Sequence, residues 1–182
     1  MTRLFIVFAG YVVLGIAFLF QVPPAPNPIK TVPVTEAQIR EGVKNEQKAK
    51  VIKRAVAAAR EVYRRNHVSE AYSETTGRVA IETGLSPRLL AAVVVVESHG
   101  NPKAVSNRDS IGLMQVNPLV WGHRKDLTNP EKNITIGASI LAAYVHKYGV
   151  VEGLHRYNGY SNIHEHIYVC KVLKAAGMEY AL

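Results

Sequence analysis

SPRLLAAVVVVES, residues 86–98, is an apolar run that ends on a single carboxylate, Glu97. Its opening Ser-Pro pair is typical of a helix start, because serine caps the first free N–H groups and proline fits the first helical position. Gly100 and Pro102 follow the run and favour the end of a helix. The stretch therefore predicts a helix over about 87–98 with a broad apolar face.

Glu97 is the carboxylate whose position in this run points to chemistry. On a helix, Leu90, Val93 and Val94 lie seven, four and three residues before it and share its face. Burial disfavours the charged form of a carboxyl group, so its pKa rises and it can act as a general acid near neutral pH. The alternatives are a charge that turns out into solvent at the helix end and a buried structural ion pair.

Three segments, the first of which begins at Glu97, carry a recognisable pattern of residues and spacing. They read Glu97-Ser98-x-x-Asn101-Pro102-x-Ala104-x-Ser106 with Gly112-Leu113-Met114-Gln115-Val116-x-Pro118, then Asn129-Pro130-Glu131-x-Asn133-Ile134-x-x-Gly137-Ala138-x-x-Leu141, then Tyr157-Asn158-Gly159. Together these segments resemble the catalytic domain of the soluble lytic transglycosylase family, from about residue 77 to residue 176. The resemblance implies a lysozyme-like fold and cleavage of peptidoglycan.

The resemblance also implies roles for individual residues. Glu97 would be the catalytic acid and base, and Tyr157 matches a tyrosine whose hydroxyl lies near that glutamate. Ser106 matches a loop serine that contacts the substrate near the cleavage site, and Gln115 matches a glutamine that lines the glycan groove. The predicted substrate-binding residues are Ser106, Gln115, Asn117, Tyr157 and Asn158.

The reaction that the resemblance implies needs one carboxylate. Glu97 protonates the glycosidic oxygen between N-acetylmuramic acid (MurNAc) and N-acetylglucosamine (GlcNAc), then removes the proton of the muramic O6 hydroxyl, and a 1,6-anhydro end forms. Ordinary glycosidases use two carboxylates. Asp109, in the loop after Ser106, is the candidate for a second one, and it would make the protein a hydrolytic muramidase. A wall-binding assembly protein without catalysis is the third alternative.

We expect neither a cofactor nor a metal. The sequence His164-Glu165-His166 places two histidines two residues apart, so on a helix they point in different directions. A helical zinc pair needs histidines four residues apart.

The N-terminal segment predicts a membrane anchor. Leu4 to Phe20 carries no charge, is preceded by Arg3, and is followed by no clear signal-peptidase site, so residues 1–21 are expected to stay as an anchor helix. Arg3 places the N-terminus in the cytoplasm, and the rest of the chain outside the cytoplasmic membrane, on the periplasmic side. Residues 22–35 form a proline-rich linker that favours an extended spacer.

The formal net charge of +8 over 182 residues predicts anionic partners. Peptidoglycan strands and the anionic polymers of the cell wall suit the resemblance, and components of a secretion system or of a virion are possible further partners. Nucleic acid is excluded as a partner, because the chain has no zinc-finger spacing and no aromatic RNA-binding signature. A virion-associated protein is the alternative to an inner-membrane location.

Helical spacing extends over most of the remaining chain, and we expect helices over about 36–66, 72–83, 133–148, 150–157 and 161–176. In the last of these, Ile167 and Cys170 belong to the predicted inward face. The predicted class is mainly α and lysozyme-like, with a small β element near 112–117, preceded by the membrane helix and a basic helix. Residues 36–68 form a basic amphipathic segment, either packed on the domain or serving as a stalk, and residues 69–182 form the lysozyme-like domain.

Overall fold

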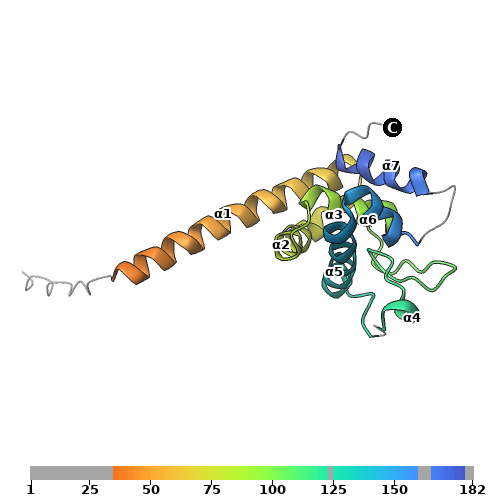
Figure 1. Cartoon of the computed structure of the whole chain (residues 1–182), viewed down its shortest axis with the longest axis horizontal. Coiled ribbons are helices and arrows are strands. Elements are labelled where there is room, and N and C mark those ends of the chain that lie inside the picture. The colour runs from red at the N-terminus through yellow and green to blue at the C-terminus, as the bar shows by residue number, and fades with distance from the viewer. Residues whose placement is uncertain (1–34, 123–124, 160–164, 179–182) are drawn as a thin grey trace, which may run out of the picture. The chain divides into compact units, whose positions relative to one another are not determined.

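The computed structural model describes residues 35–122, 125–159 and 165–178, and these fold mainly as helices (Figure 1). The chain divides into two units, Met1–Thr35 and Glu36–Leu182, and the architecture below is that of the second. Its helices are α1 (Glu36–Arg65), α2 (Ser73–Thr83), α3 (Pro87–Ser98), α4 (Pro118–Trp121), α5 (Pro130–Tyr148), α6 (Val150–Tyr157) and α7 (Glu165–Ala176), with the 3-10 turn η1 (Glu70–Tyr72) before α2.

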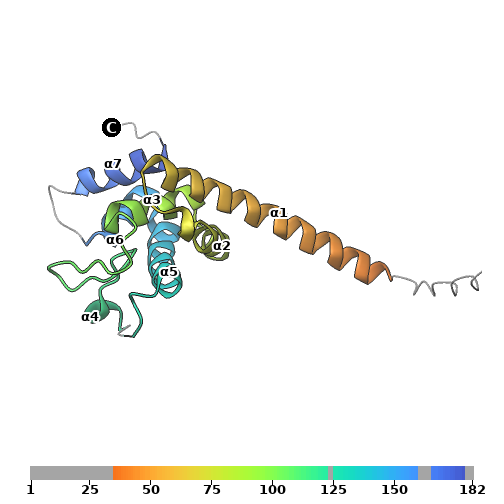
Figure 2. The same cartoon turned by 180° about the vertical axis from the view of Figure 1, so that it is seen from behind.

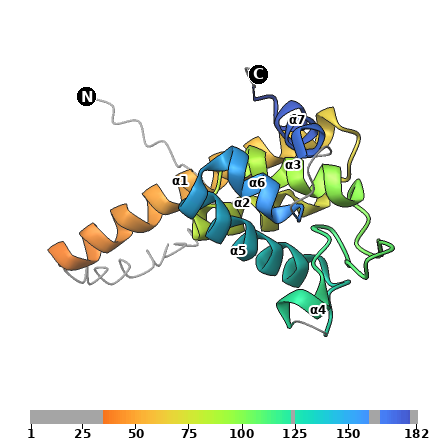
Figure 3. The same cartoon turned by 45° about the vertical axis from the view of Figure 1, so that its right-hand side comes forward.

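Helix α3 is the most deeply buried helix that the structure describes, and its bounds match the helix predicted for the apolar run. Residues 89–94 are all buried, with at most 1% of any of them exposed. The helix begins where Ser86 Oγ accepts a hydrogen bond from the Leu89 N–H, and it ends at His99, whose φ of 50° is left-handed. It packs against α1, α2 and α7, and Figure 3 shows α7 running beside it. The hydrophobic core is therefore built around the helix that carries Glu97.

Helix α1 has two halves with different surroundings. Its described side chains before residue 51 are all exposed, whereas Ala55, Ala59, Val62 and Tyr63 are buried in the core. The Tyr63 and Thr76 hydroxyl oxygens lie 2.7 Å apart in a buried hydrogen bond to α2. Figure 2 shows this second half of α1 beside α2 and α3. The core of the domain thus takes in the second half of the predicted basic segment, while the first half stays in solvent.

The predicted β element takes a smaller form than a hairpin. Ile111 forms isolated antiparallel bridges with Val105 and with Val116, and none of the described residues belongs to a strand. The side chain of Asn133 on α5 is fully buried, and its hydrogen bonds to the loop backbone take the place of further strand-to-strand hydrogen bonds. Asn133 Oδ1 accepts from the Met114 N–H at 2.7 Å, and Nδ2 donates to the carbonyls of Ile111 at 2.8 Å and Leu127 at 2.9 Å.

Gly112 permits this close approach of the loop to α5. It has a φ of 81°, and a Cβ atom at this position would collide with the Asn133 side chain and lie 2.5 Å from the Leu127 carbonyl oxygen. A residue without a side chain is therefore required here, both for the left-handed backbone and for the space.

No helix in the described part of the chain is long and apolar enough to cross a membrane. The predicted anchor, residues 1–21, lies outside the described residues, as do nearly all of the predicted linker, 22–35, and the start of the helix expected over 161–176. The helix expected over 133–148 begins earlier, at Pro130, because Asn129 Oδ1 caps it. The inward assignment of Ile167 is wrong: Ile167 is 49% exposed, and its neighbour Tyr168 is buried instead.

Candidate active site

Glu97 lies in the last turn of α3, half-buried, and its carboxyl group faces α7. The Tyr168 hydroxyl of α7 donates a hydrogen bond of 2.6 Å to Glu97 Oε1. Burial raises the pKa of Glu97 to about 7, and the hydrogen bond from Tyr168 opposes part of that rise. Among the described residues no cation forms an ion pair with this carboxyl group. Glu97 is therefore a carboxyl group poised to exchange a proton near neutral pH.

Tyr157, which the family resemblance places near the glutamate, makes its hydrogen bond elsewhere. Its hydroxyl donates to the Met114 carbonyl at 2.7 Å and so ties α6 to the loop segment 112–116. Burial, together with the nearby charge of Glu97, raises the pKa of Tyr157 well above its ordinary value. Tyr157 therefore borders the site as a neutral phenol, and Tyr168 is the tyrosine that bonds Glu97.

Four of the five predicted substrate-binding residues lie around Glu97. A cavity of about 190 Å³ beside Glu97 is lined also by Ser106, Arg108, Ser110, Gln115, Tyr157 and Asn158. A second cavity of about 360 Å³ shares Arg108, Ser110, Gln115, Tyr157 and Asn158 and adds Asn117, Trp121 and Tyr144 among others. The structure thus brings Glu97, Ser106, Gln115, Tyr157 and Asn158 to one cavity, and it places Asn117 in the adjoining one.

The loop side chains are held by hydrogen bonds to the loop itself. Ser106 Oγ accepts from the N–H groups of Arg108 and Ser110, at 3.2 and 3.1 Å. Gln115 Nε2 donates to the carbonyls of Ala104 and Gly112, at 3.3 and 3.0 Å. These bonds stabilise a loop with little regular secondary structure, and this loop forms the wall of the cavity that Tyr157 of α6 also lines.

Asn117 has two structural tasks at the far end of the loop. Its Nδ2 donates to the Arg108 carbonyl at 2.7 Å, and its Oδ1 accepts from the N–H groups of Leu119 and Val120. It therefore caps α4 and positions Trp121, whose ring meets the Tyr144 ring edge-on at a centroid distance of 6.1 Å. The second cavity thereby gains an aromatic wall, which is common in binding sites.

Asp109 does not line the cavity beside Glu97. It is exposed in a left-handed conformation with a φ of 60°, and it lines neither of the two cavities that share Gln115. Among the described residues that line these cavities, Glu97 is the only carboxylate. The geometry therefore supplies one proton-exchanging carboxyl group and a polar groove.

The residues of this region that the sequence reasoning missed include Arg108, Ser110, Trp121, Tyr144 and Tyr168. The spacing of Tyr168, Val172 and Ala175, all three buried, is a signal for the burial of Tyr168. That spacing does not identify Glu97 as its hydrogen-bond partner. Arg108 and Ser110 lie in a loop, Trp121 in a four-residue helix and Tyr144 on a partly exposed helix face, where helical periodicity does not mark a binding residue.

Comparison with known proteins adds sequence relatives to this geometry. The family model described as "Transglycosylase SLT domain" matches residues 74–167. The chain is similar to the endo-type membrane-bound lytic murein transglycosylase A of Cronobacter sakazakii, with 38% identity over 84 residues, which is 39% of this chain and 40% of the relative. The enzyme of the same name from an Enterobacter strain is 37% identical over 84 residues, with the same coverage, and that of Klebsiella pneumoniae is 38% identical over 72 residues, 32% of this chain and 36% of the relative. The matched part thus spans about two-fifths of the length of these relatives at most.

Proposed function

The chain belongs to the Transglycosylase SLT domain family, and on that premise we propose that it is a peptidoglycan lytic transglycosylase. In this proposal it cleaves the β-1,4 bond between MurNAc and GlcNAc and leaves 1,6-anhydro-MurNAc ends. The observation that carries the proposal is Glu97, a half-buried carboxyl group with a pKa of about 7 that faces a polar cavity with no second carboxylate among its described lining residues. Ordinary glycosidases need a pair of carboxylates at a set separation.

The proposed reaction uses Glu97 twice. In its protonated form Glu97 donates the proton to the glycosidic oxygen, the bond between that oxygen and muramic C1 breaks, and the GlcNAc side leaves as an alcohol. The positive charge at C1 is stabilised by the N-acetyl group of the same sugar. Glu97, now a carboxylate, removes the proton of the muramic O6 hydroxyl, and O6 bonds to C1. The protein recovers its proton and no water is consumed.

The pH dependence of this reaction follows from the pKa of Glu97. Because the protonated form starts the reaction, we expect kcat/KM to fall as the pH rises through about 7.

In Tyr168→Phe the carboxylate of Glu97 loses the hydrogen bond that favours its charged form. The pKa of Glu97 therefore rises, and the alkaline limb of the pH profile moves to higher pH. The measurement is kcat/KM on purified peptidoglycan between pH 5 and pH 9. Tyr157→Phe is the matched control, since the Tyr157 hydroxyl bonds the Met114 carbonyl and not Glu97. The alkaline limb of the pH profile of this variant should stay at the wild-type pH. A limb that moves to lower pH in Tyr168→Phe contradicts the assignment.

Product analysis distinguishes the proposed reaction from its alternatives. We expect mass spectrometry of muropeptides released by the full chain to show 1,6-anhydro-MurNAc ends, which are lighter by one water than hydrolysed ends. Reducing ends would instead mean that water attacks C1, as in a hydrolytic muramidase, and Asp109→Asn would then test whether Asp109 holds that water. Binding to peptidoglycan without any release would favour a wall-binding assembly protein.

The location is also part of the proposal. The relatives are named membrane-bound, and residues 1–21 have the composition of an anchor helix. We place the catalytic domain on the periplasmic side of the cytoplasmic membrane, where the wall lies. Local wall remodelling, or opening of the wall for a secretion or conjugation apparatus or for phage entry or lysis, would suit an anchored enzyme of this kind.

A further inference from the structure

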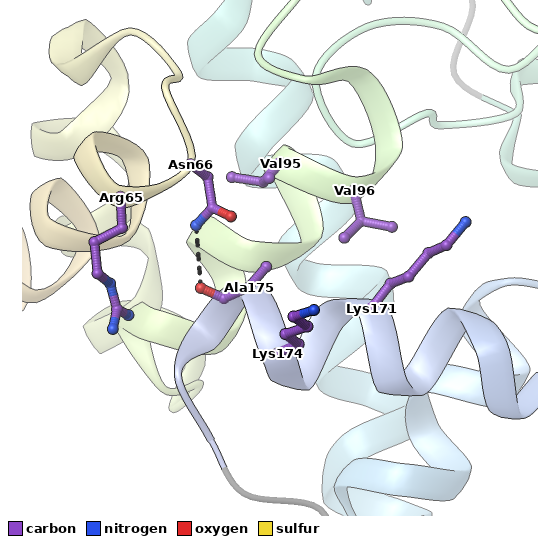
Figure 4. Close-up of a pocket in the computed structure, with 7 residues that line it drawn as sticks. All are labelled: Arg65, Asn66, Val95, Val96, Lys171, Lys174 and Ala175. Atoms are coloured by element: carbon purple, nitrogen blue, oxygen red, sulfur yellow. Dashed lines mark hydrogen bonds between the residues drawn. The ribbon is translucent and has the colours of Figure 1, made fainter.

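A cavity of about 440 Å³ lies outside the groove described above, where the end of α1, the end of α3 and the second half of α7 meet. Figure 4 shows Val96 of α3 pointing toward α7 and Val95 pointing toward Asn66, with Lys171 and Lys174 on α7. A volume of this size falls within the range of small-ligand sites. The cavity combines a small apolar surface with cationic side chains, and the reaction proposed above uses none of them.

The charge of this cavity is one-sided. Its lining includes Arg65, Lys171 and Lys174 and no carboxylate. Neither lysine forms an ion pair with a described residue, in contrast to Lys132, which pairs with Asp126 at 2.6 Å. Unpaired cations around one cavity attract an anionic ligand.

Arg65 has a structural task that the two lysines do not share. It donates to the Ala176 carbonyl at 3.3 Å, and its guanidinium lies so close to Gly177 that a Cβ there would be 2.7 Å from Nη2. A cation at the last carbonyls of a helix is explained by the helix dipole. Lys171 and Lys174 are therefore the cations of this cavity that a ligand would meet, and Arg65 closes its end.

The basic cavity adjoins the catalytic glutamate. Val96 and Lys171 also line a neighbouring cavity of about 320 Å³, together with Glu97, Asn158, Ile167 and Tyr168. A ligand held at Glu97 can thus continue past Val96 and Lys171 into the basic cavity without leaving the surface of α3 and α7. The exposure of Ile167, 49%, is consistent with an apolar wall along that path.

We propose that this basic cavity binds the carboxylate-bearing peptide of the MurNAc residue whose bond is cleaved at Glu97. The inference rests on the proposed function, because that reaction places a MurNAc residue, with its peptide branch, next to Glu97. Lys171 and Lys174 pair with the free carboxylates of the peptide, and Val95 and Val96 contact its aliphatic parts. The cavity thereby makes the enzyme favour strands that still carry peptides over bare glycan.

The test uses the full chain with Glu97→Gln, which leaves the substrate intact, and measures the Kd for two ligands. These are purified glycan strands of one length, with their peptides and after enzymatic removal of the peptides. In this background Lys171→Gln with Lys174→Gln is expected to weaken binding of the peptide-bearing strands about fivefold, as the loss of two exposed charge pairs would. Binding of the bare strands should stay unchanged. The loss should shrink as salt is added.

The matched control is Lys44→Gln with Lys48→Gln, which removes the same charge from the exposed first half of α1. It should leave both Kd values as they are. Equal losses for the two kinds of strand, or no loss for either, would overturn the peptide site. The proposed function is decided separately, by release of 1,6-anhydro ends by the chain with Glu97 intact. Peptide-selective binding without release of 1,6-anhydro ends would therefore contradict the assignment as an enzyme and support the peptide-binding site.

Discussion

Glu97→Gln is expected to abolish peptidoglycan cleavage, with kcat/KM lower by about a thousandfold or more, because glutamine keeps the shape of the side chain and cannot donate or accept the proton. The loss exceeds that of an ordinary general acid if the same group serves both as acid and as base. The measurement is the rate of release of 1,6-anhydro muropeptides at pH 6, where most of the Glu97 side chains are protonated. Binding of glycan strands should persist in the variant.

The pH dependence of the free energy of unfolding tests the raised pKa of Glu97 independently of catalysis. The pKa of Glu97 is about 7 in the folded chain against 4.5 for an ordinary glutamate, so the folded state holds a proton that the unfolded state has lost between these pH values. The free energy of unfolding of the wild type should therefore fall by about 3 kcal/mol between pH 4.5 and pH 8 through this group. The variant should lack this fall.

Asp109→Asn is the matched control for the loss of activity, since it removes an exposed carboxylate of the neighbouring loop. We expect it to keep nearly full activity. Substantial lysis by a folded Glu97→Gln variant would show that another group supplies the proton, and a large loss in Asp109→Asn would favour a second catalytic carboxylate.

Asn133→Ala is expected to lower the free energy of unfolding by about 4 kcal/mol. The fully buried side chain makes three hydrogen bonds to the loop backbone, to Met114, Ile111 and Leu127. Each buried polar group left without a partner costs roughly 1–3 kcal/mol. Activity should fall as well, because the same loop carries the Gln115 side chain. Urea unfolding at pH 6 measures the loss.

The control for this substitution is Asn101→Ala. Its Oδ1 accepts one exposed hydrogen bond, from the Lys103 N–H at 2.9 Å, so its removal should cost less than about 1 kcal/mol. A loss below about 1.5 kcal/mol in Asn133→Ala would mean that water or a rearranged loop satisfies the freed groups, and that Asn133 is not the main support of the loop.

Much of the site could be read from local sequence. The apolar run and its Ser-Pro start predicted α3 with its observed bounds, and helical spacing placed Glu97 on a face shared with valines. Both inferences depend on neighbours within about two turns, and such neighbours are visible in the sequence. The gathering of Ser106, Gln115, Tyr157 and Asn158 around Glu97 was predicted from the family resemblance, and the cavity brings them together.

The partner of Glu97 was not predictable in this way. Tyr168 lies 71 residues further along the chain, and it reaches Glu97 only because α7 packs against α3. Helical periodicity assigned the inward face of α7 to Ile167, which is about 100° around the helix from Tyr168. An apolar residue at the edge of a helix face packs inward or lines a groove depending on the neighbouring helix, and sequence spacing does not specify that neighbour.

The sequence by itself determined the helices other than α4, the half-buried acid at the end of α3 and the membership of the chain in the Transglycosylase SLT domain family. These features depend on short-range spacing and on motif residues. Only the tertiary structure decided the hydrogen bond from Tyr168, the diversion of the Tyr157 hydroxyl to Met114, the support of the loop by Asn133 and the basic cavity beside Lys171. Each of these joins segments that are distant in the chain, and their contact is set by how the helices pack around α3.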